Sequence, residues 1–144
     1  MKIAIGSDHA GLTLKRTLLA SVLKELDSVD LGTDSPQAID YPDIGHRLAE
    51  AVASGRYERG ILICGTGIGM AMTANKTRGI RAANCSDTYS AEMSVQHNNA
   101  NVLCLGGRTL GPALAERITR VWLNARFTGG RHAERVKKIE LFNQ

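Results

Sequence analysis

Short runs of β-branched and apolar residues alternate along the chain with longer stretches whose apolar residues recur every three or four positions. The short runs predict five strands, over Lys2–Gly6, Val29–Leu31, Gly60–Cys64, Ile80–Asn84 and Val102–Leu105. Strands that alternate with helices favour a parallel sheet with right-handed crossovers and with helices on both faces. We therefore expect one α/β domain over residues 1–144.

The longer stretches predict the helices. Apolar residues at helical spacing mark the first, at Leu12, Leu19, Val22, Leu23 and Leu26. A second helix is expected from Pro42 to Ala53, because proline suits a first helical turn, and others are expected after Gly69, Asp87 and Pro112. In the helix after Pro112, one buried side is predicted for Leu114, Ile118, Val121, Trp122 and Ala125. A final helix is expected from about Arg131.

Composition narrows the class of protein. Hydrophobic residues make up 43% of the chain and charged residues 22%, as in soluble globular proteins, and no apolar run approaches the roughly 20 residues of a membrane span. The chain enters its first predicted strand at once, without the segments of a secretory leader, so we expect a cytoplasmic protein. The net charge of +4 is scattered, which favours a small anionic ligand over nucleic acid.

The three cysteines, Cys64, Cys85 and Cys104, each end or follow an apolar run. Their odd number makes a disulfide framework improbable, so reduced thiols are expected. No pair of them has the spacing of a zinc site.

The segment from Gly60 to Gly69 carries the strongest chemical signal. An apolar strand runs into Cys64, which is followed by glycines at alternate positions, Gly65, Gly67 and Gly69. In α/β proteins the carboxyl ends of strands form the ligand crevice, and a glycine-rich turn into a helix directs backbone N–H groups at an anion. A thiol at such a position ionises more readily than free cysteine. The other interpretation is that Cys64 is a small apolar residue that ends a buried strand.

Polar residues also gather at other loops, and each has a simpler structural explanation. Asp8 and His9 follow the first strand, and helix capping alone would explain the presence of Asp8 there. Tyr41 could belong to an ordinary turn, and His97 lies in an asparagine-rich loop before the fifth strand. Arg131 and Arg135 share a helix face and could grip one phosphate, or could simply face solvent. Together at crevice positions, these residues favour a functional site.

The motifs together resemble a known family. The resemblance rests on Gly6–Gly11, Asp40–Pro42, Ile63–Gly69, Ala74–Lys76, His97-Asn98, and Gly129–His132 with Arg135. In this order they are similar to the type B ribose-5-phosphate isomerases, whose superfamily includes the galactose-6-phosphate isomerase subunits. The resemblance implies a three-layer αβα sandwich of Rossmann-like type with a five-stranded parallel sheet. It also implies a homodimer, or a dimer of dimers, with active sites shared between chains, and no metal or organic cofactor.

The resemblance further implies a reaction and a role for each site residue. The reaction is the interconversion of ribose 5-phosphate and ribulose 5-phosphate, with Cys64 as the base and His97 in ring opening. Asp8 and Tyr41 would contact sugar hydroxyls or the ring oxygen, and Asn98 would hold the reacting oxygens. Gly65, Thr66, Gly67 and Gly69 would line an anion hole, with Asp8 and Thr66 counted among the catalytic residues. The phosphate would be held by His9, Arg108, Arg131 and Arg135.

Position 70 differs from part of the family, and the difference favours Cys64 as the base. Some relatives carry a glutamate base just after the last glycine of the loop, where this chain has Met70, which cannot take a proton. Three alternatives remain: an isomerase of a six-carbon sugar phosphate such as allose or galactose 6-phosphate, a non-catalytic sugar-phosphate-binding protein, and a dinucleotide-binding module. The last is disfavoured because Met70 stands where that motif needs glycine or alanine.

Overall fold

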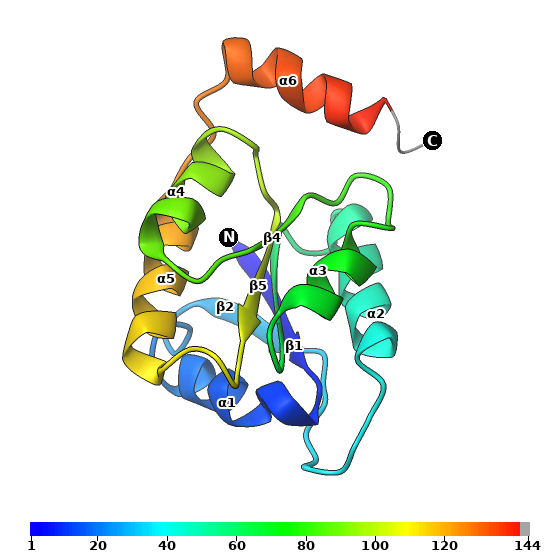
Figure 1. Ribbon diagram of the computed structural model, residues 1–144, viewed down its shortest axis with the longest axis vertical. Helices are drawn as coiled ribbons and strands as arrows, with labels where there is room; N and C mark the ends of the chain where they lie inside the picture. Colours follow the sequence, from blue (N-terminus) through cyan, green and yellow to red (C-terminus); the bar gives the residue numbers. More distant parts are fainter. Residues whose placement is uncertain (142–144) are drawn as a thin grey trace.

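The computed structural model describes residues 1–141 and contains one sheet of five parallel strands (Figure 1). The strands are β1 (Lys2–Ser7), β2 (Asp27–Asp30), β3 (Arg59–Cys64), β4 (Ala82–Asn84) and β5 (Val102–Gly106). Their order across the sheet is β2-β1-β3-β5-β4, and every neighbouring pair is parallel. The predicted five-stranded parallel sheet is therefore confirmed, with each strand within two residues of its expected bounds.

Helices cover both faces of the sheet. The chain forms a short 3-10 helix at His9–Gly11, followed by α1 (Leu12–Ala20), α2 (Tyr41–Ala53), α3 (Ile68–Ala74), α4 (Thr88–Gln96), α5 (Pro112–Asn124) and α6 (Arg131–Glu140). Helices α2 and α3 pack on one face, and α1, α4 and α5 pack on the other (Figure 1). This arrangement is the predicted three-layer αβα sandwich.

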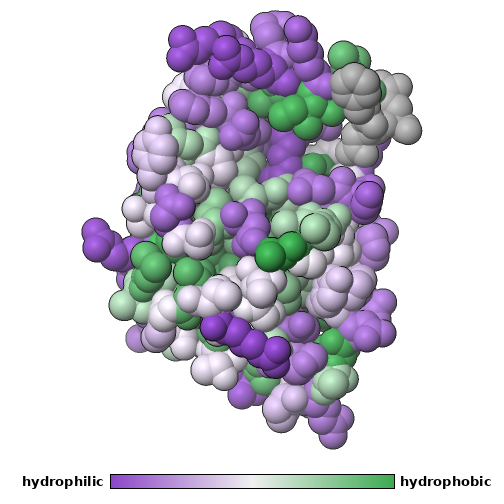
Figure 2. All heavy atoms as spheres, in the orientation of Figure 1, coloured by the Kyte–Doolittle hydropathy of each residue, from purple (hydrophilic) through white to green (hydrophobic). Residues whose placement is uncertain are grey.

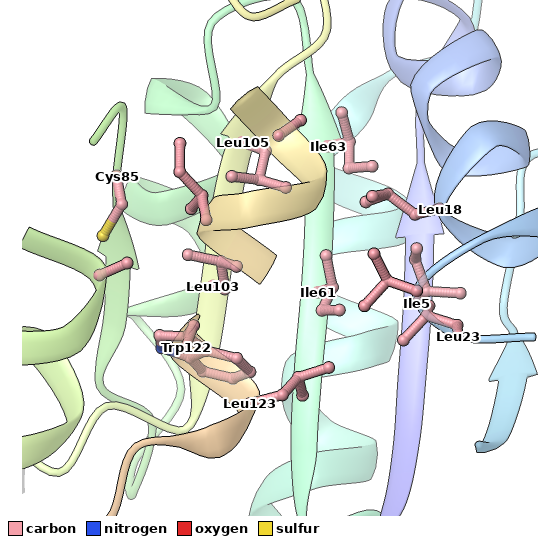
Figure 3. Packing of buried hydrophobic residues seen from close by; sticks show 14 of the residues in the cluster. Ile5, Leu18, Leu23, Ile61, Ile63, Cys85, Leu103, Leu105, Trp122 and Leu123 are labelled. Atoms are coloured by element: carbon pink, nitrogen blue, oxygen red, sulfur yellow. The ribbon is translucent and has the colours of Figure 1, made fainter. Parts of the chain in front are cut away.

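The core lies in two layers because successive strand residues point to opposite faces. On one face, Ile5, Ile61 and Leu103 pack with Leu18 of α1 and Trp122 of α5 (Figure 3). On the other face, the strand residues between them pack against α2 and α3. With the sheet fixed from both sides, the loops at the carboxyl ends of the strands start from rigid positions.

The first helix is shorter than predicted. It ends at Ala20, and residues 21–26 form turns instead. Val22 and Leu23 are still buried, whereas Leu26 is 45% exposed. Helical spacing of apolar residues misplaced this end, because Val22 and Leu23 continue the helical spacing but are buried by the turn that follows the helix.

The apolar side predicted for α5 is correct in part, because Val121 is only half-buried and the start of the side is exposed. Ile118, Trp122 and Ala125 are buried, but Leu114 is 41% exposed. Leu114 lies in the first turn of the helix. Among the described residues, none of the helices has the length and apolar character that crossing a membrane requires.

Helix α6 lies outside the three layers, beyond the end of the sheet where the strands begin (Figure 1). Val136 is its one buried residue. Hydrophilic side chains cover its outer side, at the top of the view in Figure 2. The helix is held to the body by an ion pair between Arg81 and Glu140, with 2.7 Å between Nη1 and Oε1.

Candidate active site

The thiol of Cys64 ends the central strand β3 and lies inside the glycine-rich loop. The Sγ atom accepts a hydrogen bond from the backbone N–H of Gly67 at 3.2 Å. Gly67 has a φ of +83°, and a Cβ atom there would lie 2.4 Å from Oδ1 of Asn84. Only glycine can adopt this conformation in this space without strain. The loop therefore places an N–H group against the sulfur through a residue that cannot be exchanged.

Two further side chains border this loop. The ring of Tyr41 covers Gly69 so closely that a Cβ on the glycine would lie 2.6 Å from Cζ. The side chain of Arg108 runs past Gly65, and the backbone N–H of Arg108 donates to the Gly65 carbonyl at 2.9 Å. An aromatic hydroxyl and a guanidinium thus border the same loop as the thiol. Thr66 is exposed, and its Oγ1 accepts from the N–H of Ile68 at 3.2 Å.

The loop after β1 adds Asp8 and His9 on the neighbouring strand. The backbone N–H of Asp8 donates to the carbonyl of Ile63, which precedes Cys64. The carboxylate of Asp8 is buried and accepts from the N–H of Gly11 at 3.1 Å, so Asp8 caps the first helical turn, as its simpler structural explanation requires. The Nδ1 atom of His9 accepts from the N–H of Ile39 at 3.2 Å. Because Nδ1 accepts, the neutral ring carries its proton on Nε2.

These residues form one group at the carboxyl edge of the sheet, which we call the thiol edge: Asp8, His9, Tyr41, Cys64, Gly65, Thr66, Gly67, Gly69 and Arg108. Arg108 and the proton on Nε2 of His9 supply donors suited to an anion. Met70 is fully buried in the core, as its apolar side chain requires, so the loop has no carboxylate at that position. Within residues 1–141, no three His, Cys, Asp or Glu side chains lie together in a way that could hold a metal ion.

The remaining predicted site residues lie at the opposite edge of the sheet. His97 follows α4 and precedes β5, and Arg131 and Arg135 lie on α6 (Figure 1). Strand β5 has five residues, and at about 3.3 Å per residue it separates its two ends by roughly 15 Å. The expectation that all these residues line one crevice is therefore wrong for a single chain. We call this second group, formed by His97, Asn98, Arg131 and Arg135, the helix edge.

The helix edge has its own geometry. Helix α6 begins at Arg131, as predicted, and its four-residue spacing places the exposed Arg131 and Arg135 on one face. The loop after His97 turns through Asn99, which adopts a left-handed φ of +52°, as the asparagine-rich sequence suggested. Asn98 lines a cavity of about 610 Å³ between α6 and the start of β4, together with Lys76 and Arg81.

Sequence reasoning missed one contact at this edge. The imidazole rings of His97 and His132 are stacked, with centroids 4.2 Å apart and planes 7° from parallel. The pKa of His132 is lowered by desolvation and then by the positive charges of His97, Arg131 and Arg135. His132 stands beside Arg131 in the sequence, but nothing in the spacing of the two histidines indicates that their rings meet.

Comparisons with known proteins define the class. A family profile described as Ribose/Galactose Isomerase matches residues 3–139. The chain is 46% identical to ribose-5-phosphate isomerase B of Escherichia coli, over 99% of this chain and 97% of that protein. It is 48% identical to D-erythrulose-4-phosphate isomerase of Pectobacterium atrosepticum, over 96% and 93% of the two chains. The solved structure of Clostridium thermocellum ribose-5-phosphate isomerase B is 52% identical and superposes with a TM-score of 0.96, over 98% and 96%.

With its fold and its thiol-bearing loop, the protein is thus an α/β enzyme of the sugar-phosphate isomerase class. The chain belongs to the ribose/galactose isomerase family, among the type B ribose-5-phosphate isomerases. The resemblance noted in the sequence is confirmed. The comparisons also favour an isomerase over the dinucleotide-binding and the non-catalytic alternatives.

Proposed function

We propose that the protein interconverts D-ribose 5-phosphate and D-ribulose 5-phosphate through an enediolate, with Cys64 as the base. The observation that carries this proposal is the position of the thiol, at the carboxyl end of β3 with the N–H of Gly67 3.2 Å from Sγ. This hydrogen bond holds the sulfur in a fixed position at the start of the glycine-rich loop. The names of the E. coli and C. thermocellum relatives support the five-carbon substrate.

The reaction requires a proton to move between two carbons. The thiolate of Cys64 takes the proton from C2 of the open-chain aldose and returns it to C1, while a proton passes from the oxygen on C2 to the oxygen on C1. The enediolate between these steps carries negative charge on oxygen, which preorganised N–H donors stabilise. The N–H of Gly67 donates to Cys64 and that of Ile68 to Thr66, so we assign this role to the other backbone N–H groups of the Gly65–Gly69 loop, with Thr66 beside them. Asp8 and Tyr41 border the loop where sugar hydroxyls would lie.

The second part of the proposal is that two chains share each site. Ring opening needs an acid–base group and the phosphate needs fixed cations, and His97, Arg131 and Arg135, which the resemblance assigns to these roles, lie at the helix edge, remote from Cys64. In a homodimer that brings the thiol edge of one chain to the helix edge of the other, His97 and Asn98 would meet the sugar and Arg131 and Arg135 would meet the phosphate. Exposed apolar residues on α3, Ile68 at 48% and Met72 at 65%, support a contact surface beside the thiol loop.

Phosphate binding would then combine donors from both edges. His9 offers Nε2–H, since its Nδ1 is held by the N–H of Ile39, and Arg108 lies beside Gly65. Arg131 and Arg135 would add bidentate guanidinium donors from the second chain. Binding the non-reacting end of the sugar in this way fixes C1 and C2 against the thiolate, so that remote binding energy is used for orientation.

We also propose the cytoplasm as the compartment. Cys64, Cys85 and Cys104 are all free thiols in the structure. Unpaired cysteines suit a reducing compartment.

The substrate is tested by comparing kcat/KM for four aldose phosphates: ribose 5-phosphate, allose 6-phosphate, galactose 6-phosphate and erythrose 4-phosphate. The last belongs in the set because the P. atrosepticum relative is named for a four-carbon substrate. The Cys64→Ala variant, purified identically, measures any contaminating host isomerase. We expect the five-carbon sugar to give the highest kcat/KM. A higher value for a four- or six-carbon sugar would reassign the substrate.

A further inference from the structure

The stacked rings of His97 and His132 come from two different elements at the helix edge. His97 is the C-cap residue that follows α4, and His132 lies in the first turn of α6. Their centroids are 4.2 Å apart and their planes are nearly parallel, at 7°. Aromatic rings at this separation attract each other and restrict each other's rotation.

The backbone on both sides keeps the two rings together. The N–H of His97 donates to the carbonyl of Met93 at 2.8 Å, and the N–H of His132 donates to that of Gly129 at 3.1 Å. Between them, Thr128 binds the carbonyl of Gln96 twice, through its N–H at 3.1 Å and through Oγ1 at 2.8 Å. The residue before His97 is thus tied to the segment that leads into α6. These hydrogen bonds fix the end of α4 against the segment before α6, and with it the position of the two rings.

The ring plane of His97 depends on this stack. Both rings are half-buried, and in the part of the chain from 1 to 141 no hydrogen bond holds a ring nitrogen of either histidine. The torsion that turns an imidazole about its Cβ–Cγ bond is otherwise broad. Desolvation lowers the pKa of His132, and so do the charges of the groups that face it, His97, Arg131 and Arg135. The stack is thus the contact that restricts this torsion at His97.

We propose that His132 is a positioning residue for ring opening, which holds the plane of the His97 imidazole so that its nitrogen meets the sugar ring oxygen. This inference rests on the proposed function, in which His97 opens the furanose ring. His132 itself touches no reacting atom in this proposal. Replacing His132 should therefore slow ring opening, which His97 performs, and should leave the rate of proton transfer at Cys64 unchanged.

Two assays separate these steps. The first is conversion of ribose 5-phosphate, which is almost entirely cyclic and needs ring opening. The second is exchange of the C1 proton of ribulose 5-phosphate with D₂O, followed by NMR. Ribulose 5-phosphate cannot close a five-membered ring because its 5-hydroxyl carries the phosphate, so exchange needs only the base and the enediolate. The variants are His132→Ala, His132→Leu and His132→Phe, with His97→Asn as the reference and His46→Ala, on the exposed face of α2, as the matched control.

We expect His132→Ala and His132→Leu to lower kcat for ribose 5-phosphate by about tenfold, with KM and C1 exchange within about twofold of wild type. His132→Phe keeps a flat stacking partner and should recover most of the loss. The leucine variant fills similar volume without a flat ring, so it preserves the test if the alanine variant fails to fold. Full activity in both loss variants would overturn the proposal, as would a phenylalanine variant no better than leucine. Equal losses in conversion and exchange, or a raised KM, would assign His132 to phosphate binding instead.

The reference variant keeps this inference distinct from the proposed function. If His97→Asn loses conversion but retains exchange, ring opening by His97 stands and the His132 variants decide the positioning role. If His97→Asn loses both equally, the proposed role of His97 fails, and the positioning role of His132 fails with it. A third outcome would overturn only the inference about His132. In that outcome His132→Ala loses conversion but retains exchange, while His97→Asn behaves as wild type in both assays.

Discussion

The backbone N–H of Gly67 points at the sulfur of Cys64 from 3.2 Å away. The contact depends on the left-handed conformation of Gly67, whose φ is +83° and whose absent Cβ leaves room for Asn84. Glycine is thus required at position 67 because only glycine can adopt the conformation that directs this N–H at the sulfur. The relationship links the most informative motif of the sequence to the chemistry that we propose for it.

Replacing Cys64 by alanine should remove the base and leave the fold intact. We expect kcat to fall by about 10³ or more, with KM little changed, because the thiolate acts in the transition state. Steady-state kinetics with ribose 5-phosphate provide the measurement. The matched control is Cys104→Ala, a buried thiol on the same face of the sheet, which should retain kcat. Turnover by Cys64→Ala close to that of the control would reject the assignment of the base.

The two other thiols predict how stability depends on pH. Burial raises the pKa of Cys85 from 9.0 to about 11, and burial also raises the pKa of Cys104. Between about pH 9 and about pH 11 the unfolded chain therefore loses a proton that the folded chain keeps at Cys85, so the folded state is destabilised as the pH rises. Denaturant unfolding across this range should show a falling free energy of unfolding.

The Cys85→Ala variant isolates that contribution from the other groups that titrate at high pH. Its free energy of unfolding should decline less steeply than that of wild type from about pH 9 upwards, and the two curves should run parallel at lower pH. Identical slopes over the whole range would mean that Cys85 ionises as readily in the folded chain as in the unfolded one.

The fold was largely predictable because short apolar strands alternate with helices along the chain. The central strands β3 and β5 are buried along nearly their whole length, so composition alone marked them within one residue. The end of α1 was not predictable, because Val22 and Leu23 satisfy a helical period while lying in a turn. Local periodicity reports burial, and the backbone conformation that achieves the burial is set by packing.

In the candidate site, the contact between residues close together in the sequence was predictable, and the contact between distant residues was not. The contact of Cys64 with Gly67 lies within one loop and could be anticipated from the glycine spacing. The division of the predicted residues between two edges follows from strand direction, because in a parallel sheet a residue that precedes a strand, such as His97, lies opposite one that ends a strand, such as Cys64. The stacking of His97 on His132 joins residues distant in sequence, and no periodicity or motif encodes it.

Replacing His97 by asparagine should separate ring opening from isomerisation. We expect conversion of ribose 5-phosphate to fall far more than C1 proton exchange of ribulose 5-phosphate, because histidine is the side chain that both donates and accepts protons near neutral pH. NMR in D₂O measures the exchange and a coupled assay measures the conversion. His46→Asn, an exposed histidine on α2, is the control and should leave both rates unchanged. Equal losses in the two assays would give His97 a binding or structural role.

Replacing Arg135 should test recognition of the phosphate. Lysine keeps the positive charge but loses the planar guanidinium, so we expect KM to rise clearly in Arg135→Lys and further in Arg135→Ala, with a smaller effect on kcat. Lys138→Ala removes a charge from an exposed position on the same helix and serves as the control. Should Lys138→Ala raise KM as much as Arg135→Ala, net charge rather than a phosphate contact would explain the effect.

The division of the site between two edges leads to a complementation experiment. One parent carries Cys64→Ala, and the other carries Arg131→Ala with Arg135→Ala. If the base and the phosphate arginines of each site come from different chains, a mixed dimer has one site with both defects and one site with none. At random exchange half of the dimers are mixed, so the mixture should recover about a quarter of wild-type activity, which neither parent has.

An arrangement in which each chain supplies its own complete site predicts the opposite result. Every site of a mixed dimer then carries one of the two defects, and mixing cannot restore activity however the subunits exchange. Native mass spectrometry must first show that mixed dimers have formed, and a mixture of either parent with itself gives the baseline. The roughly 15 Å that β5 alone places between the two edges makes a complete site within one chain geometrically implausible. Mixed dimers that are no more active than their parents would therefore reject the shared site and, with it, the proposed pairing of the thiol edge with the helix edge.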